Sequence, residues 1–294
     1  MPSKRRRLSA FVKILLSLVL VCGSLVAGAY YVLTTFEPID TTPPPPEPGC
    51  RLTMSDGRYP MENAQAASAA TVGGVAFGQD LPPEAVTIAF ATVWQESAFY
   101  NVEYGDRDSL GLFQQRPSQE WGDPEQILDP VYASSSFYEE LVEVDGWRSI
   151  PVYEAAQAVQ RSADGYAYDQ HERLSTRMAE VFTGTQGAAL TCWYGTEGLA
   201  DLRSGEADTE AALEEMERVF GTAPADLPPD GDEEPRTGDL GWAMALWAVA
   251  HAEEYGLTSV SYDGQRWRAS DGTDDAEDWA AADGGDTGGG LVLE

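Results

Sequence analysis

The chain has 294 residues and a formal net charge of −31, and its hydrophobic content of 43% is enough for a sizeable core. Five of its 18 Lys and Arg residues precede position 14, so only 13 arginines accompany 49 acidic residues in the rest. A surface this acidic repels phosphate backbones, which excludes nucleic-acid binding. We interpret the acidity as an adaptation for solubility, with recruitment of cationic partners as the alternative.

The first expected element is a membrane anchor. Ile14 to Leu33 is a run of 20 residues without a charge, and as a helix it would be about 30 Å long, the thickness of a bilayer's hydrocarbon core. The basic residues from Lys4 to Arg7 would keep the N-terminus in the cytoplasm. We therefore predict that residues 1–33 are a basic start and one transmembrane helix in the plasma membrane, with the later segments extracellular. A cleaved signal peptide is the alternative.

Two further features define the next boundaries. Residues 34–49 are predicted to be a Pro-rich linker, because the stretch from Thr41 to Gly49 favours a stiff polyproline II helix. Cys50 and Cys192 are the cysteines outside the predicted membrane span, and in an oxidising compartment they would form a disulfide. Two free thiols are the alternative. This pair marks residues 50–192 as a domain.

Residues 50–192 have a helical pattern. Met61 to Phe77 is Ala-rich, and Pro82-Pro83 is typical of the start of a second helix. Asp123-Pro124 predicts the start of a short third helix. Apolar side chains then recur at helical spacing in two more stripes, Ala133, Phe137, Leu141 and Val144, followed by Val152, Ala156, Val159 and Ala163.

Glu96 lies in the last turn of the second predicted helix. It is at the edge of the face formed by Val86, Ala89, Phe90, Val93 and Ser97. Partial burial and the negative end of the helix dipole both raise the pKa of a carboxyl group at such a place. A carboxylic acid that stays protonated near neutral pH can protonate the leaving oxygen of a glycosidic bond.

The residues after Glu96 resemble a known superfamily. Glu96-Ser97 is followed by a turn-rich stretch and then by Gly111-Leu112-Phe113-Gln114. This pattern resembles goose-type lysozymes and lytic transglycosylases, in which the second motif is Gly-Leu-Met-Gln. The likeness covers roughly Met61 to Phe182 and is greater to an actinobacterial group of membrane-anchored wall proteins. It implies a mainly α, lysozyme-like domain with a short β-hairpin.

The resemblance also implies residue roles. Glu96 matches the catalytic acid, and Gln114 matches a residue that binds substrate in the cleft. Asp106 lies where goose-type lysozymes have a second carboxylate, with Asp108 as its competitor; turn formation is the alternative for both. An inverting hydrolase needs such a base, whereas a lytic transglycosylase does not, so the reaction class stays open. We assign substrate binding to Ser97, Tyr104, Gln114 and Gln160.

One position departs from the family pattern. Where many transglycosylases have a Tyr that bonds to the catalytic region, this chain has Val159. Either Tyr153 or Tyr166 supplies the hydroxyl, or the site works differently or is degenerate. Aromatic residues that could stack on sugars are expected around the groove: Tyr100, Tyr104, Trp121, Tyr132 and Trp147.

The sequence changes character after Cys192. Residues 193–237 are predicted to be an acidic helix, Thr209 to Phe220, and a linker. Residues 238–269 are predicted to be a small α+β module with a helix from Gly241 to Tyr255 and a hairpin. The module resembles a degenerate domain found beside peptidoglycan hydrolases. We expect no metal, and we place His251 on the helix surface. The acidic, Gly-rich tail, residues 270–294, is expected to be largely disordered, although Leu291 to Leu293 could form a strand.

Together with these patterns, the resemblance implies an extracellular enzyme without a cofactor that cleaves the glycan strands of peptidoglycan. The alternative is a non-catalytic peptidoglycan-binding or scaffold protein on a degenerate lysozyme-like fold. The third hypothesis, a transporter, is disfavoured because one predicted span offers neither a pore nor a polar pair at mid-membrane.

Overall fold

The computed structural model describes residues 10–35, 47–54, 56–161, 165–226, 237–272, 278–282 and 290–294. The chain divides into two units, Met1–Pro44 and Pro45–Glu294. The first unit contains helix α1 (Ala10–Thr35). In the part of the chain that the structure describes, no helix meets the combined length and apolarity needed to span a membrane. Most of the predicted Pro-rich linker lies outside the described residues.

The second unit is mainly helical. Its larger α-helices are α2 (Asn63–Gly78), α3 (Pro83–Glu96), α5 (Pro130–Val142), α6 (Val152–Gln160), α7 (Glu172–Phe182), α8 (Gly195–Ser204), α9 (Thr209–Phe220) and α10 (Leu240–Ala250). Shorter helical pieces are η1 (Pro117–Gln119), α4 (Pro124–Ile127), η2 (Gly165–His171), η3 (Pro224–Asp226) and α11 (Ala252–Tyr255). The mainly α class predicted from the sequence is therefore confirmed.

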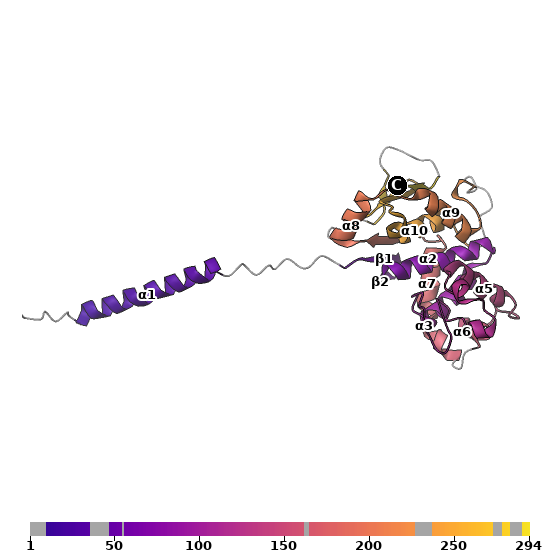
Figure 1. The fold of residues 1–294 in the computed structure, drawn as a ribbon, viewed down its shortest axis with the longest axis horizontal. Helices are drawn as coiled ribbons and strands as arrows, with labels where there is room; N and C mark the ends of the chain where they lie inside the picture. Colours follow the sequence, from indigo (N-terminus) through magenta and orange to yellow (C-terminus); the bar gives the residue numbers. More distant parts are fainter. Residues whose placement is uncertain are drawn as a thin grey trace, which may run out of the picture. The chain divides into compact units, whose positions relative to one another are not determined.

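Helix α2 lies at the centre of this unit. In Figure 1 it runs between the group α3, α5, α6 and α7 and the group α8, α9 and α10. Its Ala- and Gly-rich sequence allows both groups to approach closely. A Cβ atom on Gly74 would lie 2.5 Å from a methyl group of Val219 and 2.9 Å from the ring of Phe220, both in α9. A larger residue there would push the two helices apart.

The start signals in the sequence correspond to real helix ends. Helix α3 begins at Pro83, with Pro82 in an extended conformation before it. Asp123 precedes α4 in a capping box, as expected from Asp123-Pro124. The predicted helix Thr209–Phe220 is confirmed as α9. The apolar stripe of α6 is buried at Ala156 and Val159, while Ala163 lies outside the described residues.

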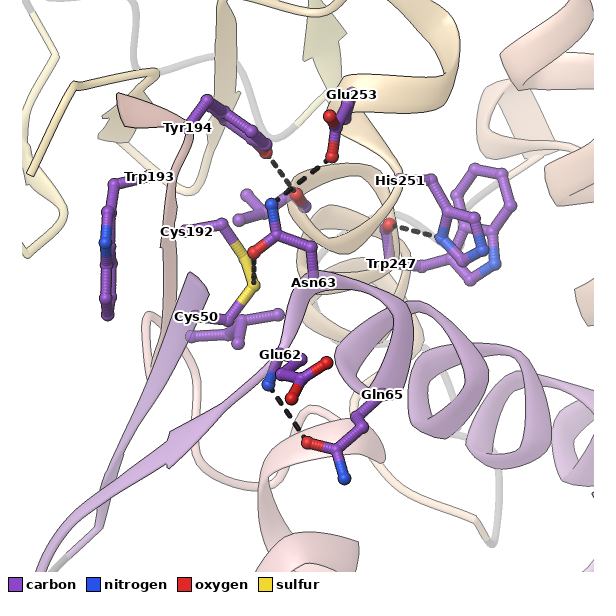
Figure 2. The surroundings of a disulfide bond; sticks show 12 residues. Cys50, Glu62, Asn63, Gln65, Cys192, Trp193, Tyr194, Trp247, His251 and Glu253 are labelled. Carbon is purple, nitrogen blue, oxygen red and sulfur yellow. Dashed lines mark hydrogen bonds between the residues drawn. A yellow bond between two sulfur atoms is a disulfide. The ribbon is translucent and has the colours of Figure 1, made fainter. Parts of the chain in front are cut away.

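A small antiparallel sheet was not predicted. It has the order β2-β1-β3 and consists of β1 (Gly49–Met54), β2 (Gly57–Met61) and β3 (Leu190–Trp193). Cys50 and Cys192 are directly paired in its register and form the predicted disulfide, which is thus confirmed. Figure 2 shows Asn63, the first residue of α2, beside the disulfide, with its side-chain nitrogen donating to Glu253 at 3.3 Å. The disulfide therefore lies where the sheet, α2 and α11 meet.

The C-terminal part contains the predicted hairpin. Strands β4 (Ser259–Tyr262) and β5 (Gln265–Arg268) pair around Asp263-Gly264, and both turn residues have positive φ, as a two-residue hairpin turn requires. Strands β6 (Ala280–Ala281) and β7 (Val292–Leu293) complete a sheet of order β6-β5-β4-β7. The predicted final strand is therefore confirmed.

The described residues of the tail have more order than expected. Trp279 is buried and its indole N–H donates to the carbonyl of Leu190 at 2.9 Å. Its ring also packs edge-on against Trp242 of α10. Residues 278–282 and 290–294 thus belong to the folded unit, because an indole buried this way has both an apolar environment and a hydrogen-bond partner.

Helix α10 joins the C-terminal part to the rest of the unit. It is buried along its whole length and packs against α2 and β3. The surface placement expected for His251 is wrong. Its ring is buried, donates from Nδ1 to the carbonyl of Trp247 at 3.0 Å, and lies 3.3 Å from the hydroxyl of Thr71 in α2. Figure 2 shows this ring beside Trp247. Residues Pro45–Glu294 consequently form one compact unit.

Candidate functional site

The site begins at the C-terminal end of α3. Glu96 is the last residue of this helix, and Ala98 and Phe99 both adopt positive φ, at 51° and 65°. The turn buries Phe99 completely, edge-on against Phe90 and Trp94. The free energy gained by burying this ring outweighs the strain of two residues in the left-handed backbone conformation. The helix must therefore end at Glu96, and the carboxyl group lies at its C-terminus.

The carboxyl group of Glu96 is half-buried and hydrogen-bonded. The hydroxyl of Tyr168, in η2, donates to its Oε1 at 2.7 Å. Burial raises the pKa of Glu96 above its ordinary value, and the hydrogen bond from Tyr168 opposes that rise. The net direction is upward, as the position at a buried helix end predicts. A proton is consequently held on this carboxyl group to a higher pH than on an exposed glutamate.

The segment Gly111–Gln114 is held against this helix end. The hydroxyl of Ser97 donates to the carbonyl of Leu112 at 2.7 Å. From the other side, the side-chain amide of Gln160 in α6 donates to the carbonyl of Phe113 at 2.8 Å. The ring of Phe113 stacks on Phe137 of α5 with 4.6 Å between centroids. Ser97, Gln160 and the Gly111–Gln114 segment therefore lie together at the end of α3, and Ser97 and Gln160 both bond to backbone carbonyls.

Gln114 closes the loop that precedes it. Its side-chain amide donates to the carbonyls of Gly111 at 3.2 Å and Tyr104 at 3.3 Å. Its φ of 50° is left-handed, which orients the side chain back over the loop. The ring of Tyr104 is 76% exposed. Tyr104 is thus free of the core and available to a ligand, whereas Gln114 holds the loop in shape.

The two candidates for a second carboxylate, Asp106 and Asp108, differ in hydrogen bonding and in exposure. Asp108 accepts hydrogen bonds from Arg116 at 2.9 Å and from the backbone N–H and hydroxyl of Ser118. The Ser118 bonds, with Arg116, lower the pKa of Asp108 far below its ordinary value. The side chain of Asp106 is 91% exposed and lies 3.8 Å from Arg107. Asp108 is therefore a structural residue of the loop, as the alternative interpretation proposed.

The expected β-hairpin after Glu96 is much reduced. Among the described residues from Asn101 to Arg116, the ladder consists of a single bridge between Leu110 and Gln115. Turns make up most of the rest, with Arg107 and Gly111 at positive φ. The short hairpin of this domain is β1–β2 instead, and the loop after Glu96 is fixed by side-chain hydrogen bonds such as those of Asp108 and Gln114.

A hollow of about 510 Å³ adjoins this loop. It is lined by Ser118, Gln119, Glu120, Trp121, Glu140, Val159, Gln160 and Arg161. Gln160 both lines the hollow and holds the carbonyl of Phe113, so the hollow adjoins the Gly111–Gln114 segment. The half-buried ring of Trp121 supplies an apolar face of the kind on which sugars stack. Of the other aromatic residues expected at the groove, Trp147 is buried in the core.

Sequence reasoning missed Tyr168. Tyr153 and Tyr166, the two candidates considered, stack on one another with centroids 4.8 Å apart, and the hydroxyl that reaches Glu96 is that of Tyr168. Its neighbours extend the network, because Gln170 and His171 both lie 3.1 Å from the side-chain oxygen of Gln95. The signal in the sequence was only a Tyr-rich stretch without helical spacing.

The described residues include no group of three His, Cys, Asp or Glu side chains that could hold a metal ion. No protein-family model matches the chain, and no curated protein matches it.

Proposed function

We propose that the protein cleaves the glycan strands of peptidoglycan, with Glu96 as the general acid. The observation that carries the proposal is the half-buried carboxyl group of Glu96, whose pKa is raised and which is oriented by Tyr168 at 2.7 Å. Glycosidic cleavage requires a proton donor to the leaving oxygen, and a carboxyl group with a raised pKa provides one near neutral pH.

The surroundings of Glu96 support a saccharide substrate. The Gly111–Gln114 segment lies against the helix end, and the neighbouring hollow combines the ring of Trp121 with the amide of Gln160. A flat apolar face with a few polar groups around it is what a sugar-binding site needs. These features favour a groove for a chain of sugars.

Tyr168 also weakens the alternative of a non-catalytic wall-binding protein. That alternative depended on Val159, which has no hydroxyl where many lytic transglycosylases have a Tyr. In this chain Val159 is buried, and Tyr168 reaches the acid from η2 instead. This contact supports the proposal that a hydroxyl from a different part of the chain takes the place of the family Tyr.

The carboxylates favour one reaction class. An inverting hydrolase needs a base about 6.5–9.5 Å from the acid, held so that it activates water. Asp108 is committed to Arg116 and Ser118, and Asp106 is almost fully exposed. We therefore favour a lytic reaction in which the sugar's own 6-hydroxyl attacks and leaves a 1,6-anhydro end.

Digestion of purified cell walls tests the proposal. The full chain should clear walls in a zymogram, and Glu96→Gln should lose clearing because an amide cannot donate the proton. Asp106→Asn is the matched control and should retain activity. Mass spectrometry of the products should show the anhydro sugar. Wild-type protein that binds walls without releasing any fragment would overturn the enzymatic proposal.

Anchoring of the protein to the plasma membrane through residues 14–33, with the second unit outside, is a separate proposal from the sequence. The proposed role of Glu96 does not depend on this anchoring. Protease protection of α1 in intact membranes would test it.

A further inference from the structure

A second recess, of about 310 Å³, is lined in part by Gln170 of η2. Its lining residues come from the turn between β1 and β2, from β2 itself, from η2 and from α7: Asp56, Tyr59, Gln170, Arg173, Leu174 and Arg177. Two of the 13 arginines that follow the N-terminal basic segment thus line one small recess of a strongly acidic protein. Each of the two guanidinium groups faces a carboxylate, Arg173 that of Asp56 and Arg177 that of Glu180, so a ligand carboxylate would bind here by exchange.

The arginines of this recess are held loosely enough to accept a ligand. The side chain of Arg173 is 87% exposed, and its guanidinium lies 3.4 Å from Asp56. Exposed pairs of this kind contribute little stability, so a ligand carboxylate can replace Asp56 on Arg173. Arg177 is more enclosed and is bonded to both oxygens of Glu180, at 3.1 and 3.0 Å. Arg173 is therefore the main candidate for contact with an anion.

Two other lining residues, Tyr59 and Leu174, give the recess an apolar wall. Tyr59 and Leu174 are half-buried and packed against the core, and they form a wall beside the guanidinium groups. A guanidinium group binds a carboxylate through paired hydrogen bonds, and an apolar wall accepts aliphatic groups. This combination differs from the hollow at Trp121 and suits a short acidic peptide better than a sugar.

The recess is connected to the candidate acid through η2. Gln170 lines the recess and donates to Gln95 at 3.1 Å, while Tyr168, two residues earlier, donates to Glu96. Gln95 and Glu96 are adjacent in α3. One short segment of backbone thus positions both a wall of the recess and the hydrogen-bond partner of the acid.

We propose that this recess binds the carboxylate-bearing peptide arm of the wall polymer, with Arg173 as the principal contact. The identity of the ligand rests on the proposed function, because peptidoglycan glycans carry short acidic peptides. The site would then select strands that bear peptides and orient them across Glu96.

Titration with a soluble peptide tests the binding step directly. The probe is a free tetrapeptide of the wall-stem type with its terminal carboxylates intact, added to the full chain in a calorimeter. Arg173→Gln should weaken binding by about tenfold or more, the loss expected for one charge-assisted hydrogen bond. Arg203→Gln, an exposed arginine in α8 outside the recess, should leave binding unchanged.

Two results would overturn the inference: no binding of the peptide to wild-type protein at millimolar concentration, or equal affinity in Arg173→Gln and wild type. Glu96→Gln should bind the peptide as wild type does. The titration therefore decides the inference even if the wild type proves unable to cleave walls.

Kinetics separate the peptide site from the cleavage site. On peptide-bearing strands, Arg173→Gln should raise KM several-fold with little change in kcat, because the site acts in binding. On strands stripped of their peptides, wild type and Arg173→Gln should behave alike. A loss of kcat on both substrates would indicate that Arg173 supports the catalytic region instead, and would contradict the proposal.

Discussion

At the scale of single residues, the contact between Tyr168 and Glu96 sets the protonation of the candidate acid. The hydroxyl donates to the carboxyl oxygen and so stabilises the ionised form, which lowers the pKa. Tyr168→Phe should therefore raise the pKa of Glu96 further, because burial would act unopposed. The alkaline limb of the pH profile of kcat/KM, which reports this acid in the free enzyme, should move to higher pH.

Tyr153→Phe is the control for this prediction, because the hydroxyl of Tyr153 bonds to Glu154 and not to Glu96. Its pH profile should match that of the wild type. An alkaline limb at the same pH in Tyr168→Phe and wild type would show that the tyrosine has no influence on the acid.

His251 makes a second residue-scale prediction, for stability. Burial lowers its pKa to about 4, whereas an unfolded chain leaves a histidine near 6.5. The unfolded state binds the proton first as pH falls, so this residue costs roughly 3 kcal/mol of stability between about pH 6.5 and 4. Above that window the histidine is neutral in both the folded and the unfolded state, so this loss of stability is absent.

The measurement is urea unfolding at pH 7 and at pH 4.5, for wild type and His251→Gln. The acidic side chains titrate in both proteins, so the difference between their pH slopes isolates the histidine. The variant should lose less stability on acidification. Identical slopes would mean that His251 does not stay neutral in the folded protein.

The sequence could place Glu96 but not its partner. Apolar spacing defines α3 and its end, and the Pro82-Pro83 start fixes the register, so the carboxyl group was placed at the edge of the buried face. Tyr168 lies 72 residues further along in a short 3-10 segment, where side chains have no amphipathic period to follow. Its approach to Glu96 is a consequence of how η2 packs on α3.

At the scale of elements, the close approach of α2 and α9 depends on Gly74. A Cβ atom there would lie 2.5 Å from Val219, which no helix pair tolerates without moving. Gly74→Ala should therefore destabilise the protein by about 1–3 kcal/mol, the usual cost of overpacking, despite alanine's better helix propensity.

Gly78→Ala, in the same helix, is the matched control. The nearest atoms to a Cβ on Gly78 are 3.6 Å away, an ordinary contact. This change should be neutral or slightly stabilising. Thermal unfolding of the two variants measures the difference, and a Gly74→Ala protein as stable as Gly78→Ala would show that α9 can move aside.

Elements with a strong local signal could be predicted, and those formed by distant pairing could not. The hairpin β4–β5 has a two-residue turn whose Asp263-Gly264 sequence is itself a signal. The sheet β2-β1-β3 has strands of four to six residues, and its β3 comes from residues 190–193, far along the chain from β1. Neither an alternating apolar and polar pattern nor a turn sequence indicates that pairing.

At the scale of the whole molecule, the disulfide is the strongest single constraint on the unfolded chain. It joins residues 142 positions apart, and closing a loop of that length is worth ~5 kcal/mol in the chain-entropy model. Replacing both cysteines, Cys50→Ser with Cys192→Ser, should lower the melting temperature by roughly 10–20 °C for a unit of this size.

Cys22→Ser is the control for that loss, since Cys22 is an exposed free thiol. It should melt as the wild type does, and adding a reductant should shift the wild type towards the double variant. A double variant with an unchanged melting temperature would contradict the entropic account of this bond.

The same bond also defines how the molecule would respond to tension. Cys50 is the second residue of β1, and Cys192 lies in the paired strand β3. A force applied between the two chain ends is therefore transmitted from β1 to β3 through the disulfide. Residues 51–191, which include Glu96 and Tyr168, stay outside the mechanical load path. Tension between the two chain ends would therefore leave the surroundings of Glu96 undeformed.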